Sequence, residues 1–254
     1  MRLTHRTRCL NRCRLQIESD IQRAVSSEFR WLWRQLYPKL RRLGAKREAI
    51  ARDDYANHFG KAIDASSIWQ LFQDRIASKV LAVIEAGAEM LAQTENAFWR
   101  RRGKELDIKP ADIVARYEQS IGRQIKDIGE TTRRKISQEV IDYYNTPGRS
   151  LQELTNKTKQ WVSDSKAAAI ARTETTALNS SVTDETAQAL GITRYVWQTR
   201  RDEIVCRDDL TGPDGRTYAG CRELHGKEFL ITQPMPPAHV NCRCSPSLII
   251  PGAK

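Results

Sequence analysis

Side chains that can bind metal gather in the last fifth of the sequence. Four of the six cysteines and two of the four histidines lie between positions 206 and 244. They are Cys206, Cys221, His225, His239, Cys242 and Cys244. Thiolates and imidazoles at close spacing are the ligands of a tetrahedral zinc ion, which usually takes four of them from two short segments. The sequence therefore predicts a structural zinc site in this region.

Two converging segments are expected to supply the four ligands. The set we expect is Cys206, Cys221, His239 and Cys242, with Cys244 or His225 as substitutes. Cys244 comes second because a Cys-x-Cys spacing is tighter than the usual Cys-x2-Cys. Two alternatives stay open: packed thiols with surface histidines, and the disulfide pairs Cys206–Cys242 and Cys221–Cys244. A reducing compartment favours metal binding over disulfides.

Patterns of catalytic metal sites or nucleophiles are missing from the sequence. There is no His-Glu-x-x-His spacing and no His-x-Glu deaminase pattern, and no flanking motif supports a Cys/His nucleophile pair. We therefore expect a protein that is not an enzyme and has no small-molecule substrate.

Positive charge is concentrated at the N-terminus. The net charge is +11, and residues 1–52 hold 14 Lys/Arg against 4 Asp/Glu, a local balance of +10. Apolar residues recur every three or four positions there, which predicts a basic amphipathic helix. The arginines expected to contact a partner are Arg12, Arg14, Arg23, Arg30 and Arg34. Such a face suits a phosphate backbone or an acidic protein surface, and a merely solvated face is the alternative.

Further long helices are expected up to residue 148. Pro38 should kink or break the first helix and Gly44 can end it. The periodicity predicts a second helix over 67–102 and a third over 110–145. We expect residues 1–148 to form a basic, extended helical region.

Residues 149–254 are expected to form a small α+β domain. Ser150 and Glu153 form a capping-box pattern, and a longer helix should span 165–190. Three short strands are expected at 192–199, 227–231 and 247–250, with turn residues between them. The fold class is thus α+β: long N-terminal helices, then a domain with a short antiparallel sheet.

Polar residues on the helix at 165–190 are expected to act structurally. Arg172 and Asn179 are seven positions apart and share a face, whereas Glu174 projects elsewhere. With Trp197 on the following strand, they would form a buried polar brace between helix and sheet. A phosphate or nucleotide contact is the alternative.

Five motifs in a fixed order resemble one known family. They are Arg172-Thr173-Glu174, the strand with Trp197, the turn at Cys206, the run from Cys221 to Gly226, and the terminal PPAHVNCRC (Pro236 to Cys244). Over residues 150–250 the chain resembles the C-terminal domain of phage Mu F-like minor head proteins. One departure is that 14 residues separate Cys206 from Cys221, where the family often has close cysteines. The intervening segment looks like an inserted hairpin or loop.

The resemblance implies a structural role in a phage particle. It suggests a minor capsid protein made in the host cytoplasm and placed inside the head near the portal, acting in head assembly and DNA packaging or ejection. The implied partners are the portal protein, the major capsid protein and packaged DNA. No run of about 18 apolar residues predicts a membrane span. The alternatives are a zinc-stabilised nucleic-acid-binding protein and a toxin or nucleotide-modifying enzyme.

Overall fold

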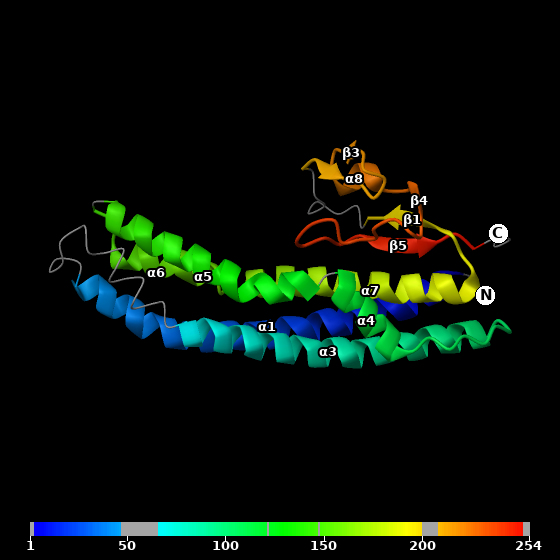
Figure 1. Ribbon diagram of the computed structural model, residues 1–254, viewed down its shortest axis with the longest axis horizontal. Coiled ribbons are helices and arrows are strands. Elements are labelled where there is room, and N and C mark those ends of the chain that lie inside the picture. The colour runs from blue at the N-terminus through cyan, green and yellow to red at the C-terminus, as the bar shows by residue number, and fades with distance from the viewer. Residues whose placement is uncertain (1–2, 47–65, 121, 147, 200–207, 251–254) are drawn as a thin grey trace. The chain divides into compact units, whose positions relative to one another are not determined.

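Helices dominate the computed structural model, and a small sheet follows them (Figure 1). The structure describes residues 3–46, 66–120, 122–146, 148–199 and 208–250. The helices are α1 (Leu3–Lys46), α3 (Ser66–Arg100), α4 (Pro110–Ser120), α5 (Gly122–Asn145), α6 (Leu151–Gln160), α7 (Asp164–Leu190) and α8 (Cys221–Leu224). The strands are β1 (Arg194–Gln198), β2 (Leu210–Thr211), β3 (Thr217–Tyr218), β4 (Glu228–Leu230) and β5 (Ser245–Leu248). The expected α+β fold class is confirmed.

The chain folds into two compact units that interleave along the sequence. Unit 1 comprises Met1–Ile21, Leu81–Gly122 and Ala169–Lys254, and unit 2 comprises Gln22–Val80 and Arg123–Ala168. The expected boundary at residue 148 lies within unit 2, between α5 and α6, and the division of the chain there stays a prediction.

In unit 2, the apolar stripe of α1 packs against α3. The stripe is buried at every position from Val25 to Leu40, and the Phe29 and Phe72 rings stack with centroids 6.0 Å apart. Glu28 is buried beside them and forms ion pairs with Arg75 and Lys79. Burial raises the pKa of this carboxyl, but hydrogen bonds from the two cations outweigh burial and lower it overall.

Pro38 does not break α1, so of the kink or break expected from the sequence the break is wrong. The helix continues past it, and past Gly44, to Lys46. A proline inside a helix costs about 3 kcal/mol because it removes one hydrogen bond and crowds the preceding turn. Leu36 and Leu40 flank Pro38 and are both fully buried, so packing on either side offsets that cost.

Two other helical predictions had different outcomes. The capping box is confirmed: Ser150 accepts a hydrogen bond from the Glu153 amide, and the Glu153 carboxylate accepts one from the Ser150 amide. The helix expected over 110–145 is described as α4 and α5, and residue 121 between them lies outside the described residues.

Unit 1 is built around α7, whose described part in this unit is buried on nearly all sides. Small and hydroxyl residues make this possible, because they let neighbouring elements approach closely. A Cβ atom at Gly87 of α3 would lie 3.0 Å from Ile17 side-chain atoms of α1 and 3.1 Å from Leu178 Cδ2 of α7. Three helices thus meet at Gly87, where any side chain larger than a hydrogen atom would force its neighbours to move.

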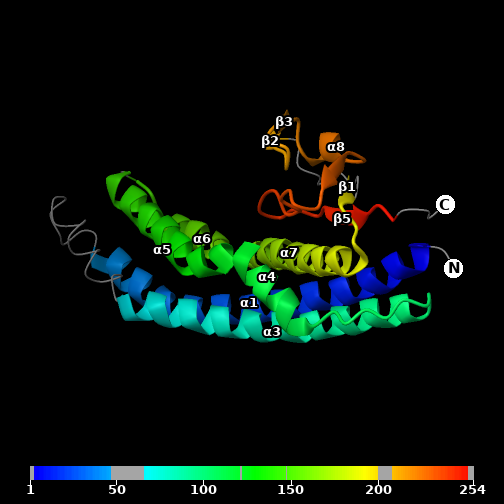
Figure 2. The same ribbon diagram turned by 45° about the vertical axis from the view of Figure 1, so that its right-hand side comes forward.

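The sheet of unit 1 lies over α7 in Figures 1 and 2. Its strand order is β4-β1-β5 and both pairings are antiparallel, with Tyr195 opposite Phe229 and Trp197 opposite Pro246. The β2–β3 hairpin and α8 lie on the far side of the sheet from α7 (Figure 2). The three predicted strands are present: β1 and β4 are shorter than predicted, and β5 lies two residues earlier in the sequence. The segment between Cys206 and Cys221 contains the β2–β3 hairpin.

Glu174 of α7 is buried in unit 1 against α4. The Tyr117 hydroxyl donates a 2.6 Å hydrogen bond to Glu174 Oε2. Burial raises the pKa of Glu174 to about 7, although the Tyr117 bond lowers it. In the unfolded chain the pKa is about 4.3, so between these values the folded state binds a proton that the unfolded state does not. The contribution of Glu174 to the free energy of unfolding therefore falls as pH rises from about 4.3 to 7, and it no longer changes at higher pH.

The substitution Glu174→Gln should remove this pH dependence. The stability of the variant relative to the native chain should rise by about 3 kcal/mol between pH 4.5 and pH 8, because the amide cannot ionise. Denaturant unfolding at several pH values measures it. Glu118→Gln, an exposed site on α4, is the control and should show no such trend. A stability difference between Glu174→Gln and the native chain that stays constant with pH would contradict the raised pKa of Glu174.

Candidate metal centre

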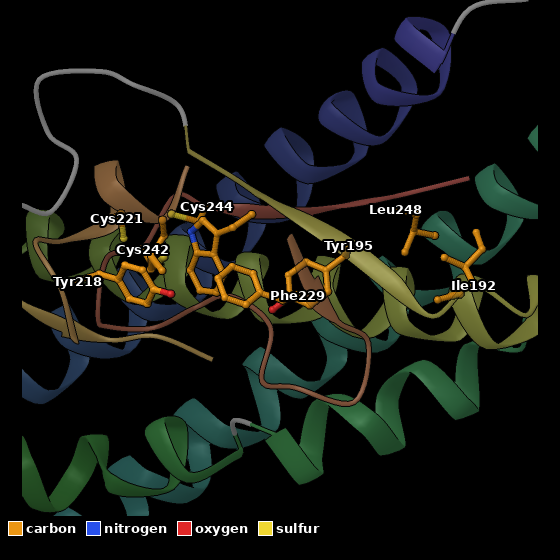
Figure 3. Packing of buried hydrophobic residues seen from close by; sticks show 11 residues of the cluster. Ile192, Tyr195, Tyr218, Cys221, Phe229, Cys242, Cys244 and Leu248 are labelled. Atoms are coloured by element: carbon orange, nitrogen blue, oxygen red, sulfur yellow. The ribbon is translucent and has the colours of Figure 1, made fainter. Parts of the chain in front are cut away.

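Two segments of unit 1 bring metal-binding side chains together. Cys221 is the first residue of α8, and His239 and Cys242 lie in the loop between β4 and β5. Their donor atoms, two Sγ and one imidazole nitrogen, all lie within 4.8 Å of one another. In Figure 3, Cys221, Cys242 and Cys244 gather at one end of the buried cluster, close to Tyr218. The three donors are close enough to bind one metal ion.

Hydrogen bonding fixes how the His239 ring faces this group. Its Nδ1 atom lies 2.7 Å from the Val240 carbonyl oxygen, and a carbonyl can only accept, so Nδ1 carries a proton. The other nitrogen, Nε2, lies 3.1 Å from Cys221 Sγ. A backbone carbonyl that holds one ring nitrogen and directs the other at the ligand position is typical of metal-binding histidines.

Burial and mutual hydrogen bonding decide which thiol is charged when no ion is bound. Thiol donation from Cys221 and Cys244, and contact with His239, lower the pKa of Cys242 despite its burial. The hydrogen bond to Cys242 in turn raises the pKa of Cys221 and that of His239. Negative charge in the cluster is therefore favoured at Cys242 over Cys221.

The loop that carries His239 and Cys242 is fastened to α7 by three hydrogen bonds. The Asn241 amide donates to Thr173 Oγ1 at 2.7 Å, and Arg172 Nη1 donates to Asn241 Oδ1 at 2.9 Å. The Thr176 hydroxyl donates to the Cys242 carbonyl at 2.9 Å. The backbone on either side of the Cys242 side chain is thus held by the helix.

A second layer of bonds holds the α7 side chains themselves. Arg14 of α1 donates to Thr176 Oγ1 at 2.8 Å, so this hydroxyl both accepts and donates. Arg172 also pairs with Glu18 of α1 at 3.3 Å. Asn241 has a φ of 66°, in the left-handed region that asparagine tolerates better than most residues. This conformation turns the chain between His239 and Cys242.

The structure brings together part of the predicted ligand set. Cys221, His239 and Cys242 meet, whereas Cys206 lies outside the described residues. Cys244, expected as a substitute, is buried with its thiol hydrogen-bonded to those of Cys221 and Cys242. His225 is not in the group, and its Nδ1 accepts a 3.0 Å bond from the Thr199 amide. The described cysteines of the cluster are free thiols.

The polar residues of α7 act differently from the expected brace between helix and sheet. Arg172 reaches the loop at Asn241, but Glu174 bonds to Tyr117 on another helix. Asn179 is buried, and Trp197 lies in the core of the sheet with 1 % of its surface exposed. Only part of this set therefore connects α7 to the sheet region.

The N-terminal arginines need one correction. Arg12, Arg23, Arg30 and Arg34 are exposed, as a partner-binding face requires. Arg14 is buried and bonds to Thr176, so it cannot serve as a surface contact. The apolar stripe alone could not reveal this, because the hydroxyl that Arg14 supports lies 162 positions away.

Three residues that position the loop were not anticipated from the sequence. They are Thr173, Thr176 and Asn241. Thr173 and Thr176 are three positions apart and therefore share a helix face, which was a usable signal. Which backbone groups they hold depends on tertiary packing.

No family model matches this sequence, and no curated protein or solved structure matches it either. The resemblance to Mu F-like minor head proteins therefore stays a proposal. Among the described helices, none is long and apolar enough to cross a bilayer.

Thr176→Val should loosen the loop and weaken metal binding. The variant keeps the side-chain shape but leaves Arg14 and the Cys242 carbonyl without this partner, which costs about 1–3 kcal/mol. Zinc affinity should fall about 10-fold, as for other groups that orient ligands. Competition with a chromogenic chelator and thermal unfolding measure the two effects.

Thr183→Val is the matched control. Thr183 is also buried on α7, but among the described residues its hydroxyl bonds to the Asn179 carbonyl of the same helix and not to the ligand loop. It should bind zinc as the native chain does. Equal zinc affinities for the two variants would mean that the α7 hydroxyl does not position the ligands.

Proposed function

We propose that the Cys/His cluster holds a structural zinc ion. Three observations support this: two buried sulfur donors, a histidine oriented through its other nitrogen, and a ligand loop fastened to α7. Soft sulfur and imidazole donors favour zinc over magnesium or calcium. A structural zinc joins segments that are far apart in sequence, as α8 and the loop before β5 are here.

We further propose that the chain is a minor capsid protein of a tailed phage, of the Mu F-like kind. The observation that carries this is the contact between two motifs of the resemblance. Arg172 and Thr173, of the Arg-Thr-Glu helix, bond to Asn241 of the terminal PPAHVNCRC segment. Motifs 69 positions apart thus build one interaction, as expected if the resemblance reflects a shared module.

In this proposal, unit 1 supplies a rigid module and the helices supply binding surfaces. The resemblance implies a location inside the head near the portal, with roles in head assembly and DNA packaging or ejection. The portal protein and the major capsid protein are the proposed protein partners, and no small-molecule substrate is implied. The proposed role of the zinc is to hold the module together rather than to catalyse.

An arginine face on the unit 2 part of α1 suits contact with packaged DNA. Arg23, Arg30, Arg34 and Arg41 are exposed, and their spacings of seven, four and seven place them on one helix face. Between residues 22 and 46 the sequence has one acidic residue, Glu28, which is buried and paired with Arg75 and Lys79. A face with no exposed carboxylate of its own helix can bind successive phosphates.

Co-purification with a portal ring tests the proposed function. The chain should bind the portal protein encoded by the same genome when both are produced together and separated by size. A chain that stays monomeric beside an assembled portal and an assembled capsid shell would contradict the capsid role. Salt-dependent DNA binding with marked base preference, and no portal binding, would favour a nucleic-acid-binding protein that acts outside a particle.

Arg30→Gln combined with Arg34→Gln tests the DNA contact. Loss of two phosphate contacts should reduce the slope of log binding constant against log salt concentration by about 2. Fluorescence anisotropy with labelled duplex DNA measures the slope. Lys157→Gln with Lys159→Gln removes the same charge from exposed positions of α6 and should leave the slope nearly unchanged. Equal slopes for both double variants would rule out a specific role of the α1 face.

A further inference from the structure

We propose that Cys244 is the fourth zinc ligand, completing a closed site of three cysteines and His239, and that the Trp197 indole N–H donates a hydrogen bond to the Cys244 sulfur. This inference rests on the proposed zinc site and does not depend on the capsid role. It assigns the fourth ligand position, which the triad of Cys221, His239 and Cys242 leaves open and for which the sequence favoured Cys206.

The backbone places Cys244 on the same side as Cys242. Burial alternates along residues 242–244, which lead into β5 at Ser245: Cys242 and Cys244 are buried and Arg243 between them is only partly buried. Both cysteines are almost fully buried, and the Cys244 thiol hydrogen-bonds to Cys221 and Cys242. Figure 3 shows the three side chains together. Cys244 is not within 4.8 Å of all three donors, so ion binding must draw it closer to at least one.

Trp197 provides the second, independent observation. Its side chain is 1 % exposed, and Nε1 has no hydrogen-bond partner at bonding geometry within the described residues. A buried donor without an acceptor costs about 1–3 kcal/mol. The indole N–H lies close enough to Cys244 to interact with its sulfur. A thiolate is a stronger acceptor than a thiol, so a metal-bound Cys244 sulfur would satisfy this donor.

The strand pairing keeps this donor in place. Trp197 lies in β1, the central strand, opposite Pro246 of β5, which is two residues after Cys244. Its backbone amide also donates to the Lys227 carbonyl at 2.9 Å. The indole is therefore held by the sheet on both sides. His225, the other described candidate, already accepts the Thr199 amide through Nδ1.

Cobalt substitution of the full chain tests the ligand set. Cobalt(II) in a tetrahedral site gives visible bands, and its near-ultraviolet band grows with the number of bound thiolates. Cys244→Ser should lose about one third of the thiolate-to-cobalt intensity, because two of three thiolates remain. Cys206→Ser is the matched control and should keep the native spectrum. Loss of intensity in Cys206→Ser, with a native spectrum for Cys244→Ser, would overturn the proposal.

Alkylation mapping of the native chain tests the same set of cysteine ligands without a substitution. Zinc should protect Cys221, Cys242 and Cys244 from a maleimide, and removal of zinc by a chelator should expose all three, as read by peptide mass spectrometry. A reactive Cys244 in the zinc-loaded protein would overturn the assignment.

A native chain that gives no cobalt bands would overturn the zinc proposal as well. Failed portal binding with intact cobalt bands would instead contradict the capsid role alone.

Trp197→Phe tests the indole contact separately. The variant should keep the intensity of the cobalt bands but shift the thiolate band and bind zinc about 10-fold more weakly. Trp161→Phe, in unit 2, is the control and should change neither. A Trp197→Phe variant with native band position and affinity would overturn the proposed N–H···S bond.

Discussion

The contact between the α7 hydroxyls and the loop at Asn241 and Cys242 is the constraint on which unit 1 depends. Thr173 and Thr176 hold two backbone groups of this loop, and Arg172 holds the Asn241 side chain. These bonds form where little water can compete, so losing one leaves a buried polar group unpaired. The loop leads directly into β5, and its position therefore determines both the edge of the sheet and the direction of the ligands.

The thiol cluster creates an electrostatic problem that a metal ion would solve. Without an ion, hydrogen bonds from its neighbours lower the pKa of Cys242 and the pKa of Cys221 is raised, because a second negative charge is disfavoured in a buried site. A dication reverses this preference, since each coordinated thiol loses its proton. The arrangement of Cys221, His239 and Cys242 is thus better matched to a bound ion than to an apolar core, where thiols need no oriented imidazole.

The sequence predicts local structure here better than it predicts tertiary contacts. The capping box at Ser150, the helix ending at Leu190 and the three strands follow from local patterns and are confirmed. The continuation of α1 through Pro38 depends on packing that a proline rule ignores. Burial of Arg14 and the partner of Glu174 depend on residues many positions away. For the metal site, residue types and spacing identified Cys221, His239 and Cys242, but only the fold shows that Cys244 is the nearest further sulfur among the described residues.

Metal content of the purified chain tests the central claim most directly. Protein prepared without chelator should contain about one zinc ion per chain by elemental analysis, and a chelator should lower its unfolding temperature, because a structural ion contributes to folding free energy. Less than about 0.2 zinc per chain, with cooperative unfolding that a chelator leaves unchanged, would contradict the account.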